Sequence, residues 1–343
     1  MSLPPSEIPL GAMRFNSDSQ KLEYWNGSAW FQIRTFSPNL DGGVRGIYAG
    51  GTNTPSGNTS NEIQYFNIST QGDAADFGDL TVARMPSPMG SNTRGVFASG
   101  SPGAGPYYTN HMDYITISST GECIDFGDNE PDGNPVSGNF SMSNQTRGLI
   151  AGGTAPGITN AITHISIATT GDSKDFGDLT APRNDLRGAC ESPVRGLAFG
   201  GVTPTHTVNI DMITIPTLGN ATKFGEIVHA TQERGMGCSN SVRGLVAGGQ
   251  TPTTTSFIET VIIATQSDTA RFGDLQATNV NAGGNAATTS PTRAVFCGGQ
   301  APSDTNMMQH IEMASGGTAT DFGDLVRAQR GGATTSSGHG GLG

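Results

Sequence analysis

The chain is poor in charged residues, and this scarcity narrows the functions to consider. Only 14% of its 343 residues are Asp, Glu, Lys or Arg, and the formal net charge is −11. No run of lysine or arginine offsets this charge. Because nucleic acids and membrane surfaces are themselves negative, they should repel the protein on average. We therefore expect no nucleic-acid partner and no membrane insertion.

The sequence also lacks the segments that direct a protein to or through a membrane. Residues 1–7 have neither a basic start nor an apolar stretch, so they do not look like a signal peptide. No apolar run approaches the roughly 18 residues needed to span a bilayer. We expect a protein made as a soluble cytosolic product, or one that leaves the cell by a route other than general secretion.

Cysteine is scarce, and the motifs of common enzyme classes are missing. The cysteines lie far apart, with no CxxC pair, at Cys123, Cys190, Cys238 and Cys297. We expect them to be small buried hydrophobic side chains; a metal site or a disulfide set is the alternative. No GxSxG, P-loop or HExxH sequence is present, and the histidines show no metal-ligand spacing. We predict no catalytic residue, no cofactor and no metal.

Glycine, in contrast, is abundant, and much of it belongs to a repeat. An arginine followed by glycine, or by alanine in the last copy, recurs about every 50 residues. These arginines are Arg45, Arg94, Arg147, Arg195, Arg243 and Arg293. A Phe-Gly pair keeps the same spacing, at Phe77, Phe126, Phe176, Phe224, Phe272 and Phe322. Two markers in step indicate six copies of one structural unit, arranged as a stack or a ring.

Each unit reads as four short strands. In the fourth copy these are a small-residue run at Arg187–Pro193, an apolar run at Val194–Gly201, a β-branched run at Val208–Ile215 and a short aromatic run at Thr222–Ile227. A single four-stranded sheet cannot cover its own faces, whereas sheets packed around an axis cover one another. The predicted fold is all-β, with a six-bladed β-propeller over residues 34–343.

The two ends of the propeller are expected to join. The small-residue run occurs once more at Gly331–Ser337. The matching place before the first unit, Phe36–Gly42, contains Pro38 and Asp41, which suit an axis strand poorly. We predict that the C-terminal segment supplies the innermost strand of the first blade.

The order of these signals resembles the kelch repeat over roughly residues 40–337. The glycine pairs match well, at Gly50-Gly51, Gly152-Gly153, Gly200-Gly201, Gly248-Gly249 and Gly298-Gly299. The later tryptophan of kelch repeats is replaced by Phe-Gly in every copy. The resemblance implies a kelch-like propeller, and since kelch proteins include both enzymes and adaptors it implies no single function.

Residues 1–33 do not match the repeat. Alternating residues at Met13–Phe15, Leu22–Trp25 and Ala29–Ile33, with Asn26-Gly27 as a hairpin turn, predict a small N-terminal β-meander. This segment resembles a short module of bacteriophage tail fibres and other virion appendages. The residues that match are Gly11, Arg14, Asn16, Glu23, Trp25, Asn26, Gly27 and Trp30. The repeated T-x-x-R and F-G-D-L signals, as at Phe77–Leu80, also look like phage structural proteins.

These resemblances imply a virion protein made in the host cytoplasm, in which residues 1–33 dock to another virion protein through Trp25 and Trp30. The most variable segments are the loops that follow the glycine pairs, and loops on a rigid scaffold commonly carry binding surfaces. They span residues 52–61, 101–110, 154–160, 202–207, 250–256 and 300–306. Tyr107 and Tyr108 are candidate contacts for a sugar or a protein of the host surface.

The repeated charges have structural and functional interpretations. The six arginines could form a basic ring, but repetition in every unit favours a structural bond, perhaps with a carboxylate of a neighbouring repeat. The acids after Phe-Gly could line a ring or bind cations, but we expect turn caps that accept backbone N–H bonds, and we expect the same of Asp73 and Asp172. These acids are Asp79, Asp128, Asp178, Glu226, Asp274 and Asp324.

The sequence thus predicts a non-enzymatic phage structural protein, a tail fibre or other exposed appendage that displays a propeller for host attachment. The alternatives are a capsid decoration or tail structural protein without a receptor role, and a kelch-type carbohydrate-active enzyme or adaptor.

Overall fold

The protein consists of two compact units, Met1–Asn39 and Leu40–Gly343. The computed structural model describes residues 8–16, 21–32, 43–53, 57–103, 108–129, 136–154, 156–185, 188–203, 205–228, 235–249, 254–276, 286–300 and 303–342. The regular structure in these residues is β-strand except for one 3-10 turn, η3 (Gly340–Leu342). The expected all-β class is therefore confirmed.

The first unit is the expected meander. Its antiparallel sheet has the order β1 (Met13–Asn16), β2 (Lys21–Trp25) and β3 (Trp30–Gln32). The connection between β2 and β3 has four residues, and the Asn26 side-chain oxygen accepts the Ser28 and Ala29 backbone N–H groups at 2.9 and 2.8 Å. Gly27 has φ +100°, which explains why glycine follows the asparagine.

The second unit contains six four-stranded antiparallel sheets, which we call blades 1 to 6 and describe from the inner strand outward. Blade 1 is β32 (Ala333–Ser336), β4 (Arg45–Ala49), β6 (Glu62–Asn67) and β7 (Ala75–Asp79); blade 2 is β8 (Met85–Gly90), β9 (Arg94–Ser101), β10 (His111–Thr116) and β11 (Ile124–Asp128); blade 3 is β12 (Phe140–Ser143), β13 (Arg147–Ala151), β14 (Ala161–Ser166) and β15 (Lys174–Asp178). Blade 4 is β16 (Ala189–Glu191), β17 (Arg195–Phe199), β20 (Asn209–Thr214) and β21 (Thr222–Glu226); blade 5 is β22 (Met236–Ser239), β23 (Arg243–Ala247), β24 (Phe257–Ile262) and β25 (Ala270–Asp274); blade 6 is β26 (Ala287–Thr289), β27 (Arg293–Cys297), β28 (Met307–Glu312) and β30 (Thr320–Asp324).

Three short additions complete the strand set. β29 (Gly317–Thr318) extends blade 5 in parallel, β31 (Gln329–Arg330) pairs with β5 (Thr52–Asn53), and β18 (Val202–Thr203) pairs with β19 (Thr205–His206).

The inner strands touch one another in a closed cycle. The order of contacts is β32, β8, β12, β16, β22, β26 and back to β32. Hydrogen bonds join the last residues of neighbouring inner strands: Gly90 N to Ser143 Oγ (3.0 Å), Glu191 N to Ser239 Oγ (2.8 Å), Thr289 Oγ1 to Ser239 O (2.5 Å) and Ser336 Oγ to Thr289 O (2.6 Å). The inner strands therefore run in one direction around a common axis, as in a propeller.

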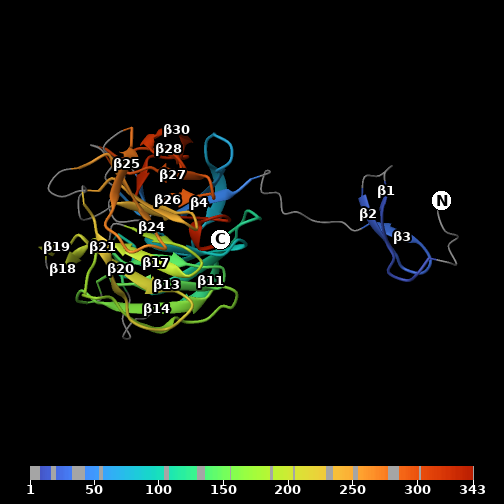
Figure 1. Cartoon of the computed structure of the whole chain (residues 1–343), viewed down its shortest axis with the longest axis horizontal. Coiled ribbons are helices and arrows are strands. Elements are labelled where there is room, and N and C mark those ends of the chain that lie inside the picture. The colour runs from blue at the N-terminus through green and yellow to red at the C-terminus, as the bar shows by residue number, and fades with distance from the viewer. Residues whose placement is uncertain are drawn as a thin grey trace. The chain divides into compact units, whose positions relative to one another are not determined.

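The chain ends of this unit are joined as the sequence predicts. β32 pairs with β4 in the register Ala333 to Ala49 and Ser336 to Gly46, so the C-terminal segment is the inner strand of blade 1 (Figure 1). Residues 333–336 are all buried.

The Phe-Gly marker marks a contact between successive blades. The phenylalanine packs into its blade, while the glycine lies against the turn between the third and fourth strands of the next blade. A Cβ atom on Gly78 would lie 2.3 Å from Gly121 O, and one on Gly323 would lie 2.3 Å from Gly72 O. The same turns donate hydrogen bonds to the outer strand, as from Gly121 N to Phe77 O at 2.8 Å. Glycine is required here because the two backbones touch.

The arginine marker also joins successive blades. Five of the six arginines donate a hydrogen bond from Nη1 to a carbonyl that ends the third strand of the next blade. The pairs are Arg45 and Ile117 (3.0 Å), Arg94 and Ile167 (2.8 Å), Arg147 and Ile215 (2.9 Å), Arg195 and Ile263 (3.2 Å), and Arg293 and Ile68 (3.1 Å). The expected structural role between repeats is confirmed, but the partner in the neighbouring blade is a carbonyl and not a carboxylate. The last of these bonds runs from blade 6 to blade 1.

The arginines of two T-x-x-R segments, Arg84 and Arg183, form buried ion pairs with aspartates of the following blade. Arg84 lies between β7 and β8, and its Nη1 atom is 2.8 Å from an Asp113 carboxylate oxygen on β10. Both side chains are almost fully buried, with 0% and 1% exposure. Arg84 also donates to the Ser99 and Phe97 carbonyls at 3.0 and 2.9 Å. Arg183 and Asp211 form the equivalent pair in blade 4.

Deleting residues 331–343 should lower the thermal unfolding midpoint by about 10 °C or more. The deletion removes the inner strand of blade 1 and its ladder bonds, each contributing about 1 kcal/mol, and about 1 kcal/mol corresponds to 2–4 °C in a large domain. Calorimetry measures the midpoint. Deleting residues 1–32, at the other terminus, should leave the propeller transition unchanged; an unchanged midpoint in the first variant would contradict the closure role.

Arg84→Met should destabilise the protein by about 3–5 kcal/mol, because it leaves the Asp113 carboxylate buried without its cation. Denaturant titration gives this value. Arg271→Met breaks the exposed pair with Asp274 and serves as the control, with an expected cost below about 1 kcal/mol. The double variant Arg84→Met with Asp113→Leu should recover part of the loss. Equal effects of the two single variants would show that the buried pair is unimportant.

Candidate functional site

The variable loops gather on one face of the second unit. In five blades the second strand of the blade ends just before a glycine pair, and in blade 2 it ends at Ser101, after Ser99-Gly100. Because all inner strands run in one direction, these strand ends lie at the same end of the blades. Neighbouring segments on this face are hydrogen bonded, as in Thr59 Oγ1 to Pro102 O (2.7 Å) and Asn184 Nδ2 to Thr154 Oγ1 (2.8 Å). We call this end of the blades the loop face.

The start of β4 and the residues that follow β32 lie at the opposite face. The chain enters the blades at Arg45, where β4 begins, and Arg45 N donates to Ser337 Oγ, which follows β32, at 3.1 Å. Arg45 is at the far end of β4 from Gly50 and the first variable loop.

The glycine pairs turn the chain sharply into the loops. Gly50 and Gly51 have φ +66° and +102°, and Gly51 N donates to Arg84 O at 2.9 Å. A Cβ atom on Gly50 would lie 2.3 Å from the same carbonyl. This hydrogen bond fixes the turn to the segment between β7 and β8. The sequence of the loop beyond the turn can therefore change without moving the turn. Tyr108 is half-buried at this face, and Tyr107 lies outside the described residues.

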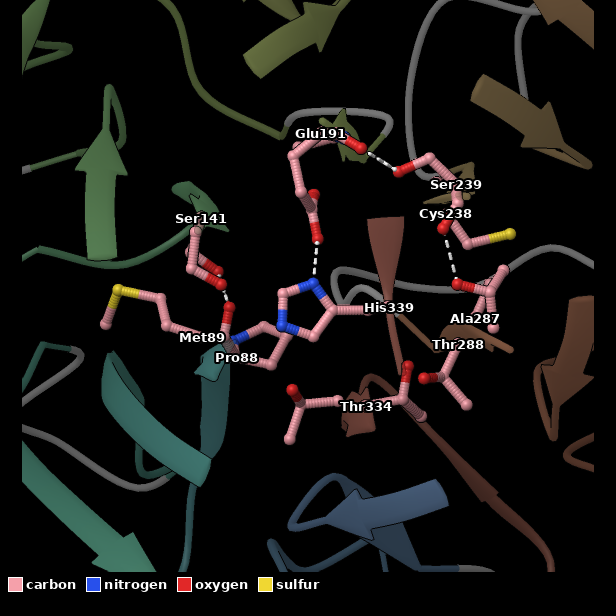
Figure 2. A pocket seen from close by; sticks show the side chains of 15 residues that line it. Pro88, Met89, Ser141, Glu191, Cys238, Ser239, Ala287, Thr288, Thr334 and His339 are labelled. Carbon is pink, nitrogen blue, oxygen red and sulfur yellow. Dashed lines mark hydrogen bonds and ion pairs between the residues drawn. The ribbon is translucent and has the colours of Figure 1, made fainter. Parts of the chain in front are cut away.

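The central axis is filled near the other face. His339 lies among side chains of the inner strands, with Nδ1 2.9 Å from Glu191 Oε1 and Nε2 2.9 Å from Gly90 O (Figure 2). The remaining cavity has a volume of about 30 Å³ and is lined largely by serine and threonine. That volume holds only one or two water molecules, whereas small-molecule sites usually measure hundreds of Å³. The axial cavity is therefore no candidate substrate site.

The motif residues of the first unit pack against one another. Glu23 accepts from Arg14 Nε at 2.9 Å and from Asn16 Nδ2 at 3.0 Å. The Arg14 guanidinium lies 4.2 Å from the centre of the Trp30 ring, which is 5.5 Å from the Trp25 ring. The bond from Asn16, followed by Arg14, lowers the pKa of Glu23 against the opposing effect of desolvation. These residues hold the module together, and Trp25 is buried within it.

The other side of this sheet is apolar and exposed. Met13 is opposite Tyr24, and Tyr24 is opposite Phe31, so all three point to one side. Phe15 shares that side because it lies two residues beyond Met13. The exposed fractions of Met13, Phe15, Tyr24 and Phe31 are 60%, 65%, 40% and 47%. The sequence analysis missed this surface, although the alternation in β1 and β2 was its signal.

The repeated acids lie on the outermost strands and do not line the axis. The Glu226 and Asp274 carboxylates accept from the Lys223 and Arg271 side chains at 2.5 and 2.6 Å. For these two, the expectation of a backbone cap is corrected. The expected caps after the turns are confirmed: Asp73 Oδ1 accepts the Asp324 N–H and Asp172 Oδ1 the Asp128 N–H, both at 3.0 Å and both across a blade boundary.

The four cysteines are buried free thiols, as expected, and burial raises the pKa of each of them. Within the described ranges, no group of three or more His, Cys, Asp or Glu side chains is placed to hold a metal ion. The described part of the chain also has no helix long and apolar enough to cross a membrane.

Comparison with known proteins identifies no relative: no protein-family model and no curated protein matches this sequence. Any functional conclusion therefore depends on the geometry and on the resemblances in the sequence.

The first unit should lose its packing as the pH falls below about 4.3, the ordinary glutamate pKa. Because the folded-state pKa of Glu23 is lowered, the ionised carboxylate stabilises the module above that pH, and this contribution is lost on protonation. Both tryptophans of the chain lie in this module, so tryptophan emission reports its unfolding alone. Glu23→Gln should abolish this acid transition. The control, Glu122→Gln in the other unit, should leave it unchanged. An identical transition in both variants would contradict the role of Glu23.

Proposed function

We propose that this protein is a non-enzymatic structural protein of a bacteriophage virion, a tail fibre or other exposed appendage that displays its propeller-like unit for attachment to the host surface. The observation that carries the proposal is the separation of the two faces. The start of β4 and the residues that follow β32 lie at one face, and the strand ends that lead into the variable loops lie at the other. An attachment made at the end of the blades where β4 begins can therefore leave the loop face to a second surface.

The first unit supports the docking half of this proposal. Its sequence resembles modules of virion appendages, and its apolar side, formed by Met13, Phe15, Tyr24 and Phe31, is of the kind that marks protein interaction sites. Trp25 supports that surface from within the module, and Trp30 is only partly exposed. The partner is another virion protein.

The loop face supports the attachment half. The glycine turns and the bonds between blades recur from blade to blade, so the strands have the same arrangement in each blade. The loops between them differ in length and sequence. The surface ligand is a glycan or a protein of the host cell. Tyr108 and Ile158, which is 39% exposed, are candidate contacts on neighbouring blades.

Adsorption to cells tests the proposal. The full-length chain, labelled with a fluorophore, is incubated with a panel of bacterial strains and measured by flow cytometry. We expect saturable binding to some strains and at least about tenfold weaker binding, about 1.4 kcal/mol, for the variant Tyr108→Ala with Ile158→Ser.

The matched control is Val194→Ser with Val242→Ser, which changes two exposed apolar residues in the turns at the opposite face. It should bind like the unchanged chain. Binding to no strain would favour a decoration or tail structural protein without a receptor role, and equal losses in both variants would show that the loop face is not the attachment surface. Turnover of a surface glycan would instead support the carbohydrate-active enzyme.

A further inference from the structure

A groove on the outer part of blade 3 is distinct from the loop face and from the axis. Its volume is about 370 Å³, three times that of the matching groove on blade 2, which is about 120 Å³. It lies beside β13, β14 and the turn that follows β14. Its lining includes Arg147, Lys174 and His164 with the hydroxyl groups of Thr146, Thr169 and Thr170.

Blade 3 has a histidine at a position where blades 1 and 2 have a tyrosine. In blades 1 and 2 a tyrosine ring covers the repeated arginine, with Arg45 4.6 Å from the centre of Tyr65 and Arg94 4.3 Å from the centre of Tyr114. The equivalent residue in blade 3 is His164 on β14, whose side chain is shorter. The Phe176 ring is 5.8 Å from the Arg147 guanidinium, which now lines the groove.

The groove is also positively charged, on a protein whose net charge is −11. Lys174 stands where blade 2 has Ile124. The acid in the lining, Asp172, accepts the Asp128 N–H through Oδ1 at 3.0 Å. Burial, followed by Arg147, lowers the pKa of His164, so its ring is neutral at pH 7. The two positive charges of Arg147 and Lys174 therefore outweigh the one negative charge of Asp172.

Blade 6 shows what happens when the same histidine has an acidic neighbour. It carries His310 at the place of His164, but its arginine, Arg293, donates from Nε to Glu312 Oε1 at 3.1 Å. The matching residue in blade 3 is Ser166, which brings no negative charge. Among the described residues, blade 3 therefore combines an arginine without a tyrosine over it, a lysine and a groove of about 370 Å³.

We propose that this groove binds a carboxylate-bearing sugar residue of an acidic polysaccharide. Arginine and lysine pair with a carboxylate through charge-assisted hydrogen bonds, and the threonine hydroxyls can donate to or accept from sugar hydroxyls. The volume falls in the range of small-molecule sites and exceeds what a bare anion occupies. The site lies away from the loop face, and its existence does not depend on the proposed attachment role.

Calorimetric titration of the purified full-length chain tests the proposal. The probes are short oligomers of galacturonate, of glucuronate and of N-acetylneuraminate, their neutral counterparts, and inorganic phosphate alone. We expect at least one acidic oligomer to bind at least about tenfold more tightly than its neutral counterpart and than phosphate. No binding of any acidic oligomer would overturn the proposal, and phosphate binding as tightly would reduce the site to a simple anion site.

Two substitutions convert the groove to that of blade 2. His164→Tyr with Lys174→Ile introduces the residues that blade 2 already accommodates, so the fold should tolerate them, which the thermal midpoint checks. This variant should lose at least about tenfold in affinity for the acidic oligomer. The control, His310→Tyr, makes the same exchange in blade 6 and should bind normally. Undiminished binding by the first variant would overturn the assignment, whatever whole-cell adsorption shows.

Discussion

Contact between backbones of successive blades is the constraint on which the rest of this structure depends. The outer strand of each blade meets the turn of the next blade so closely that a side chain at Gly78 or Gly323 would strike a carbonyl at 2.3 Å. The same approach gives the turns their hydrogen-bond acceptors and covers part of each outer strand, which would otherwise be an open sheet edge. A blade is thus incomplete without its neighbour, and the contact that links blade 6 to blade 1 closes the series.

The fold could be predicted because its constraints recur along the chain. The glycine of Phe-Gly repeats because two backbones touch there, and the arginine of Arg-Gly repeats because it bonds to a carbonyl of the next blade. Their spacing therefore predicted the number and length of the repeated units. The small residues at 331–337 indicated the joined ends in the same way, since they match the small-residue runs that precede the other units. What could not be predicted were the bonding partners of the repeated charged residues. The arginines bond to carbonyls, which have no sequence signature, and Glu226 and Asp274 bond to nearby cations.

The candidate sites were less predictable, because they depend on departures from the repeat. The groove of blade 3 differs from that of blade 2 by His164 in place of Tyr114 and Lys174 in place of Ile124, and neither difference stands out until the blades are compared in register. In the first unit the sequence drew attention to Trp25 and Trp30, because tryptophan is rare in this chain. The structure shows Trp25 as internal support, while the exposed row runs through Met13, Tyr24 and Phe31.

The position of β32 also affects the order of assembly during synthesis. Blade 1 begins with β4 near residue 45, but its inner strand is made only when residues 333–336 have left the ribosome. Translation proceeds at roughly 5–20 residues per second, so a nascent chain waits for many seconds with the axis side of its first blade open. A chain that stops before β32 lacks the strand that pairs with β4 and contacts β26 and β8, so it cannot complete the cycle of inner strands.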